Sequence, residues 1–261
     1  GEIVSISPKY GIVSDKSHCL PKEKAARCIF EYIYFARPDS HIDGVSVYGS
    51  RIEAGKYLAM DSPVDADLVV GVPESGNAAA LGYSLQSGIP YGTAFVKNSY
   101  IGRTFIKPKQ SNRESSVQVK LSVLKEAVAG KRIIMIDDSI VRGTQLRETT
   151  EFLYQSGAKE VHIRPACPPL LYGCKYLNFS RSSSEMDLIT RRVIKEIEQE
   201  GREIDLKNYV NPDTPEYEEM VGRICKQLKF TTLQFQRLDD MIESVGIGRE
   251  KLCTYCWDGR E

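Results

Sequence analysis

The chain has 261 residues, in which 35 lysines and arginines balance 35 aspartates and glutamates. Zero net charge argues against a nucleic-acid partner, because general nucleic-acid binders carry a basic excess or stripe. No apolar run is long enough to cross a membrane, and residues 1–9 lack the apolar centre of a signal peptide. We therefore expect a cytoplasmic globular protein with no membrane partner.

The first 170 residues predict strands and helices in alternation. Residues 2–20 are expected to form a strand pair, and the dense apolar run at 29–35 predicts a buried strand. Further strands are predicted at 66–72, 89–96, 131–136 and 160–166, and helices at 49–60, 77–87, 117–128 and 144–156. This rhythm is typical of an α/β domain with a largely parallel sheet.

Beyond Cys174 the pattern becomes helical. Ser184 and Asp187 form a capping-box pattern, which predicts a helix that ends at Gly201. A further helix is predicted from residue 213 toward 229, and apolar stretches at 233–235 and 238–245 finish this section. The sequence assigns no function to residues 180–230, whose charges are most simply solvated helix faces.

Two adjacent acids give the strongest chemical signal. Asp137 and Asp138 follow an apolar strand and precede a short loop that opens a helix. The loop consists of Ser139, Ile140, Val141, Arg142, Gly143 and Thr144. Its backbone N–H groups and hydroxyls can hold a phosphate, while the carboxylates can hold sugar hydroxyls and share a Mg²⁺ ion. An isolated Asp-Asp pair more often ends a strand or caps a helix, but the whole string favours the phosphate site.

This string resembles the phosphoribosyl pyrophosphate (PRPP) motif of type I phosphoribosyltransferases, and most closely that of the amidophosphoribosyltransferase family. Similar blocks occur at residues 31–40, 72–75, 97–98 and 100–106. The resemblance implies an α/β type I phosphoribosyltransferase fold, with a mostly parallel sheet flanked by helices. It also implies three parts: residues 1–20 as the remnant of a missing glutaminase domain, a core at 21–178, and a helical, cysteine-bearing extension at 179–261 that completes the same domain.

The implied reaction forms 5-phosphoribosylamine from PRPP and ammonia and releases pyrophosphate, in purine biosynthesis. In the full-length enzyme the ammonia comes from glutamine, through an amino-terminal cysteine for which this chain has Gly1. No glutaminase activity is therefore expected of this chain. Family membership also implies a homo-oligomer in the full-length enzyme.

The resemblance assigns roles to individual residues. Pyrophosphate binding falls to Pro73, Glu74, Ser75 and Gly76, and Mg²⁺ binding to Ser75, Asp137 and Asp138. Lys97, Tyr100 and Arg103 would lie on a loop that closes over PRPP, although single cations of this kind are usually solvated. One departure is that Gln145-Leu146 follow Gly143-Thr144, where the family usually has two more hydroxyl residues.

Seven cysteines include one C-x-x-C pair, Cys253 and Cys256. Alone, such a pair could be a redox site, half of a zinc site or half of an iron–sulfur site. The resemblance implies a 4Fe-4S cluster on Cys28, Cys174, Cys253 and Cys256, with zinc in the same four-cysteine site as the alternative. The remaining thiols, Cys19, Cys167 and Cys225, are expected to bind no metal.

Two other functions remain open at this point. One is nucleobase salvage by a different type I phosphoribosyltransferase, against which the cysteine set and residues 31–38 argue. The other is a PRPP-binding iron–sulfur regulatory module without turnover, which the altered Gln145-Leu146 positions allow.

Overall fold

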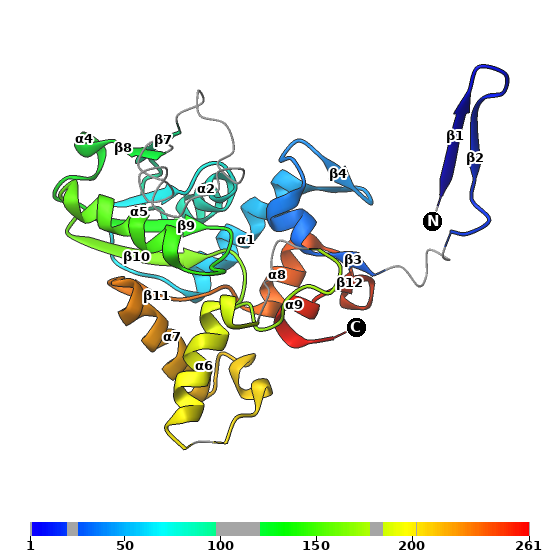
Figure 1. Cartoon of the computed structure of the whole chain (residues 1–261). Helices are drawn as coiled ribbons and strands as arrows, with labels where there is room; N and C mark the ends of the chain where they lie inside the picture. Colours follow the sequence, from blue (N-terminus) through cyan, green and yellow to red (C-terminus); the bar gives the residue numbers. More distant parts are fainter. Residues whose placement is uncertain (1, 20–25, 98–120, 178–184, 202, 261) are drawn as a thin grey trace, which may run out of the picture.

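A computed structural model describes residues 2–19, 26–97, 121–177, 185–201 and 203–260. Its centre is a four-stranded parallel sheet in the order β11, β10, β9, β6 (Figure 1). These strands are Thr232–Leu233, Glu160–Pro165, Arg132–Asp137 and Leu68–Gly71. The predicted α/β fold with a parallel sheet is confirmed.

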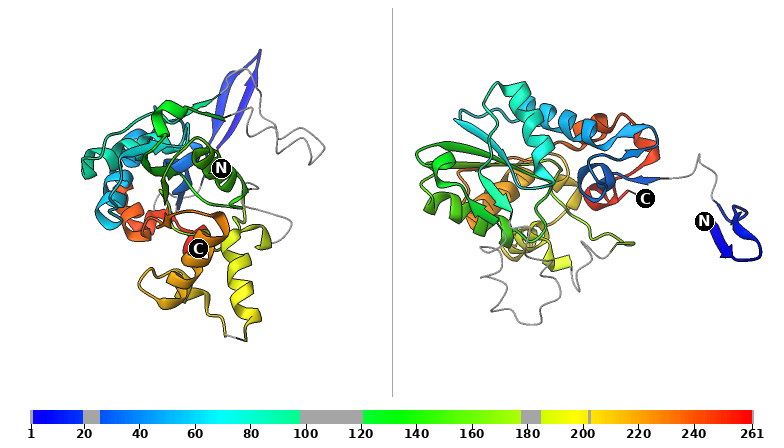
Figure 2. Two further views of the ribbon diagram at one scale, coloured as in Figure 1. Left: turned by 90° about the vertical axis from the view of Figure 1, so that its left-hand side faces the viewer. Right: turned by 90° about the horizontal axis from the view of Figure 1, so that it is seen from above.

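Helices cover both faces of this sheet. The side chains of β9 alternate, so Ile134 and Ile136 face one layer and Ile133 and Met135 face the other. The first layer holds α1 (Val47–Asp61) and α2 (Gly76–Ser87). The second holds α5 (Thr144–Gln155), α6 (Ile189–Gln199) and α7 (Pro215–Leu228). Figure 2 shows α6 and α7 running side by side.

Short elements complete the described chain. The hairpin of β1 (Ile3–Ser7) and β2 (Gly11–Asp15) agrees with the predicted strand pair and is exposed. The other strands are β3 (Arg27–Cys28), β4 (His41–Ile42), β5 (Val45–Ser46), β7 (Phe95–Lys97), β8 (Leu121–Val123) and β12 (Leu252–Cys253). The other helical segments are η2 (Glu31–Phe35), α4 (Lys125–Val128), η4 (Glu185–Asp187), η5 (Leu206–Tyr209), α8 (Leu238–Val245), η6 (Arg249–Lys251) and α9 (Tyr255–Asp258).

The predicted strand at 29–35 is wrong, because Glu31–Phe35 forms a π-helix. The buried Arg51 explains how this turn is held. Its guanidinium donates to the carbonyl oxygens of Tyr32, at 2.8 Å, and Ala36, at 2.9 Å. These carbonyls are therefore satisfied by a side chain of α1, with no need of a neighbouring strand.

Three further predictions need correction. Residues 121–123, predicted as helix, form β8, which pairs antiparallel with β7, and only Lys125–Val128 is helical. The strand predicted at 89–96 begins only at Phe95. The α-helix predicted after Ser184 begins only at Ile189, and Glu185–Asp187 before it form a short 3-10 helix; Ser184 of the predicted capping box lies outside the described residues.

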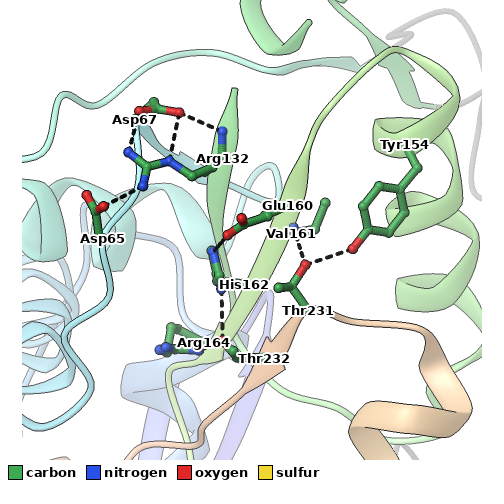
Figure 3. A network of polar contacts seen from close by, with 10 residues as sticks. All are labelled: Asp65, Asp67, Arg132, Tyr154, Glu160, Val161, His162, Arg164, Thr231 and Thr232. Atoms are coloured by element: carbon green, nitrogen blue, oxygen red, sulfur yellow. Dashed lines mark hydrogen bonds and ion pairs between the residues drawn. The ribbon is translucent and has the colours of Figure 1, made fainter. Parts of the chain in front are cut away.

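A polar network crosses the sheet at the amino-terminal ends of β9 and β10 (Figure 3). Arg132, the first residue of β9, forms ion pairs with Asp65 and Asp67. His162 is buried in β10 between Glu160 and Thr232, with both ring nitrogens 3.0 Å from an oxygen of these neighbours. Because Asp137 is the last residue of β9, this network lies at the opposite end of the strand from the acid pair.

In the part of the chain that the structure describes, no helix is both long and apolar enough to cross a membrane.

Candidate functional site

The acid pair joins the loops that follow two neighbouring strands. The hydroxyl of Ser75, in the loop after β6, donates to Oδ2 of Asp138, after β9. The hydroxyl of Ser139 donates to Oδ1 of the same carboxylate at 2.6 Å, and the Asp138 N–H donates to Oδ1 of Asp137 at 2.9 Å. The structure thus brings together three residues for which a shared Mg²⁺ ion is predicted.

Burial raises the pKa of both carboxyl groups. For Asp137 the charge of Asp138 raises the pKa further. For Asp138 the hydrogen bonds from Ser139 and Ser75 and the charge of Arg51 oppose the effect of burial. Two carboxylates held side by side away from water repel each other, and a divalent cation between them would remove that cost. The donor set therefore suits Mg²⁺, which prefers carboxylate and hydroxyl oxygens.

Gly76 allows the loop after β6 to approach β9 closely. A Cβ atom at this position would lie 2.4 Å from the carbonyl oxygen of Ile136, closer than any side chain can sit. The Val72 N–H donates to that same carbonyl at 2.8 Å. The predicted pyrophosphate loop, Pro73 to Gly76, contains a cis peptide bond between Pro73 and Glu74.

Lys97 ends β7 and reaches this loop, since its Nζ lies 3.2 Å from Oε1 of Glu74. Both side chains are exposed, so the pair is open to an incoming ligand. Tyr100 and Arg103, predicted on the same closing loop, lie outside the described residues.

The predicted phosphate loop leads from the acid pair into α5. Ile140 is buried in the core, and Gly143 adopts a φ of +78°, a backbone conformation that favours glycine. The Arg142 side chain points to Asp187, at 3.1 Å. Thr144 is exposed at the start of α5, whereas Leu146 packs into the core. Leu146 therefore fills the interior at a position where the family usually has a hydroxyl.

The four predicted cluster cysteines converge at the carboxyl-terminal turn. The parallel pairing of β3 and β12 sets Cys28 opposite Cys253. Burial raises the pKa of Cys28 to about 11, and the thiols of Cys253 and Cys174 raise it further. Burial also raises the pKa of Cys256, with contributions from the other three thiols. The Cys256 sulfur is thus within range of the charge of each of the other three.

Within the described residues, no three His, Cys, Asp or Glu side chains close around one point as a single metal ion requires. A zinc ion draws its four sulfurs to about 2.3 Å from a common centre. A 4Fe-4S cube also takes four thiolates. The four thiols, which come from three separate segments, are a ligand set that fits either group.

Trp257 anchors this turn, and the sequence alone does not reveal that role. Its ring stacks on Phe30 with centroids 4.9 Å apart, and its indole N–H donates to the Pro168 carbonyl at 3.0 Å. The Leu171 and Tyr172 N–H groups both donate to the Cys256 carbonyl, each at 3.0 Å. A lone tryptophan beside a C-x-x-C pair is the signal that could have identified it. Two further residues were not found from sequence. The charge of Arg51 acts on Asp138, and Arg192 donates to the Arg142 carbonyl, but no sequence pattern marks either arginine.

Comparison with known proteins decides the family. No family model matches the chain. The amidophosphoribosyltransferase of Archaeoglobus fulgidus is 51% identical over 175 residues, which cover 67% of this chain and 38% of the relative. Those of Synechocystis and Methanocaldococcus jannaschii are 46% and 40% identical, cover all of this chain, and match over 46% and 50% of their own length. The chain belongs to the amidophosphoribosyltransferase family.

Solved structures agree with this family assignment. The glutamine PRPP amidotransferase of B. subtilis matches the whole chain with a TM-score of 0.74 and 35% identity, over 51% of its own length. A structure described as the allosteric regulatory enzyme of purine biosynthesis matches equally well, over 50% of its length. The chain thus spans about half, or less, of the length of the relatives it matches.

Proposed function

We propose that this chain forms 5-phosphoribosylamine from PRPP and ammonia and releases pyrophosphate, as a step of purine biosynthesis. The relatives are named for that activity, and one solved structure is named for PRPP. The observation that carries the proposal is the contact of Ser75 with Asp138. It joins the loop after β6 to the acid pair after β9, which supports a single substrate site between them.

In this proposal the substrate lies between the two loops. Asp137 and Asp138 accept hydrogen bonds from the ribose hydroxyls, and their charge favours the positive charge that develops at C1. The loop from Ser139 to Thr144 holds the 5-phosphate at the start of α5. Ammonia forms its bond to C1 as the bond from C1 to the pyrophosphate oxygen breaks. Positioning and electrostatics supply the catalysis, and no side chain acts as a nucleophile.

A Mg²⁺ ion held by Asp137, Asp138 and Ser75 would neutralise the leaving pyrophosphate. Lys97, at the end of β7, lies beside Glu74 of the pyrophosphate loop, where its ammonium can approach the pyrophosphate oxygens. Tyr100 and Arg103 would complete this closing loop, and Pro73 and Gly76 would shape the backbone around the pyrophosphate.

We also propose a 4Fe-4S cluster on Cys28, Cys174, Cys253 and Cys256. When bound, it would cross-link the carboxyl-terminal turn to the core, a structural role distant from the reaction chemistry. The approach of these thiols to one another supports a four-cysteine site, in which zinc is the alternative. Further parts of the proposal are glutamine-derived ammonia from a glutaminase domain of the full-length enzyme, a homo-oligomer, and the cytoplasm, where thiols stay reduced.

The test is pyrophosphate release from PRPP with ammonia as the second substrate. Asp138→Asn should lower the rate by about a hundredfold or more, because a charge that stabilises the transition state is lost. The matched control is Asp65→Asn, which removes an exposed carboxylate at the opposite end of the sheet. PRPP binding without turnover would favour the regulatory module, and turnover only with a free nucleobase would favour salvage.

A further inference from the structure

Helix α6 donates two hydrogen bonds to backbone carbonyls of the predicted phosphate loop. The Ile189 N–H, at the start of this helix, donates to the Val141 carbonyl at 2.9 Å. One turn later the Arg192 guanidinium donates to the Arg142 carbonyl at 2.8 Å. Two successive carbonyl groups of the loop are therefore directed toward α6.

The direction of these carbonyls fixes the direction of the next N–H groups. In a trans peptide unit the C=O and the following N–H point in opposite directions. The peptide bonds on either side of Arg142 are trans. The N–H groups of Arg142 and Gly143 thus point away from α6, and in the described part of the chain neither meets an acceptor. Unsatisfied N–H groups at a helix start are anion donors.

We propose that Arg192 is a positioning residue for PRPP. By holding the Arg142 carbonyl, its guanidinium turns the Gly143 N–H toward the 5-phosphate, and the Ile189 N–H does the same for the Arg142 N–H by holding the Val141 carbonyl. This role rests on the proposed function, which it extends to residues 189–192 of a segment with no function assigned from sequence. Among the described residues the Arg192 guanidinium meets no carboxylate, so its contact with the loop is not a by-product of an ion pair.

Apolar contacts and the hydrogen bond from Arg192 hold the phosphate loop in different ways. A Cβ atom on Gly143 would lie 2.8 Å from Cδ1 of Ile189 and 3.0 Å from Cδ1 of Leu228, so the loop rests directly on α6 and α7. Apolar contacts hold the loop in place but do not fix the rotation of a peptide plane. A directional donor such as Arg192 can fix it.

Arg147 provides a matched control. It borders the same surface hollow, of about 380 Å³, as Arg142 and Arg192. Its guanidinium lies 3.6 Å from Glu151, one turn along α5, and makes no hydrogen bond to a loop carbonyl in the described residues. Arg147→Met therefore removes the same charge from the same hollow without releasing the peptide plane.

The experiment measures ammonia-dependent turnover of the whole chain while PRPP is varied. Arg192→Met should raise KM for PRPP about tenfold and leave kcat within about twofold, because it weakens binding in ground and transition states alike. Arg192→Lys should recover most of the affinity, since an ammonium can also donate to the carbonyl. The Tm should stay unchanged, and Arg147→Met should raise KM by less than about twofold.

Two outcomes would overturn the inference: an unchanged KM in Arg192→Met, or an equal rise in Arg147→Met, which would indicate a general charge effect. The backbone amide of Gly143 separates this inference from the proposed function. If wild type does not turn over PRPP, the proposed function fails. Arg192→Met should still shift the NMR resonance of the Gly143 amide nitrogen, because it releases the carbonyl of the same peptide unit, whereas Arg147→Met should not. The same resonance in both variants would refute the positioning role.

Discussion

Cys28 and Cys253 face each other across the parallel pair of β3 and β12, although they lie near opposite ends of the chain. Each of these strands has only two residues, so their ladder contributes little by itself. The stacking of Trp257 on Phe30 holds the turn from inside. The thiols are therefore assembled by apolar packing around a common space, before any metal is considered.

The first prediction concerns that space. Protein purified without oxygen should be brown and contain iron and sulfide, and Cys253→Ser should remove both. Cys225→Ser is the control, because this thiol lies in the other apolar cluster and bonds to the Phe230 carbonyl. Trp257 is the only tryptophan, so its fluorescence should be quenched by the cluster and rise when a chelator removes the iron. A colourless protein with stoichiometric zinc would refute the cluster.

The second prediction concerns the close contact of α2 with β9. Gly76→Ala should destabilise the fold by about 2 kcal/mol or more, because the added methyl would overlap the Ile136 carbonyl. Gly222→Ala, in α7, is the control: nothing lies within 4 Å of its Cβ position. There the substitution should stabilise the helix by about 0.5–1 kcal/mol. Urea unfolding measures both, and a harmless Gly76→Ala would contradict the packing.

The third prediction uses a carboxyl pair between α1 and α8. Burial, and then the neighbouring Asp61, raises the pKa of Asp240 to about 7, and Asp240 Oδ2 is buried without a described partner. An acid whose pKa is higher in the folded state binds more protons there, so the fold loses stability as pH rises from about 4 to 7. Asp240→Asn should therefore be more stable than wild type at pH 8, by about 1–2 kcal/mol after allowing for solvent screening, and the difference should be smaller at pH 5.

The matched control for this pair is Asp239→Asn. It removes the neighbouring carboxylate from the same first turn of α8, but this side chain is exposed and pairs with Arg249. Its effect should not grow between pH 5 and pH 8. If chemical denaturation gives both variants the same change in stability between pH 5 and pH 8, the pKa of Asp240 is not raised.

The fourth prediction concerns His162. Burial lowers the pKa of its ring, although the hydrogen bond to Glu160 opposes the shift. The unfolded chain then binds a proton more readily than the fold, so stability should decline as pH falls through about 6.5. His162→Gln keeps a polar side chain between Glu160 and Thr232 and should flatten this decline. If the difference in stability between wild type and His162→Gln is the same at pH 7 and pH 5.5, the prediction is wrong.

The sequence predicted correctly those helices and strands whose apolar periodicity lies within the element itself. The helix at 144–156 and the strand at 131–136 have strong apolar periodicity, and both are found within a residue or two of the expected ends. The segment at 29–35 failed because its apolar density suits a strand or a buried turn equally well. Only the guanidinium of Arg51, which comes from a distant helix, decides between them.

The same distinction applies to the candidate site. Asp137, Asp138 and Ser75 follow strands that the sequence places in one sheet, so their meeting could be expected. The contact of Arg192 with the loop could not, because it depends on how α6 packs beside α5 and α7, and no local pattern encodes that position.

The pairing of β10 with β11 has a consequence for synthesis of the chain on the ribosome. Strand β11 is the outer neighbour of β10, yet it is made only after α6 and α7 have been translated. Until residues 232–233 emerge, the nascent sheet has an open edge that can pair with other chains. Slow translation between residues 166 and 232 should therefore increase aggregation, whereas slow translation after residue 233 should not.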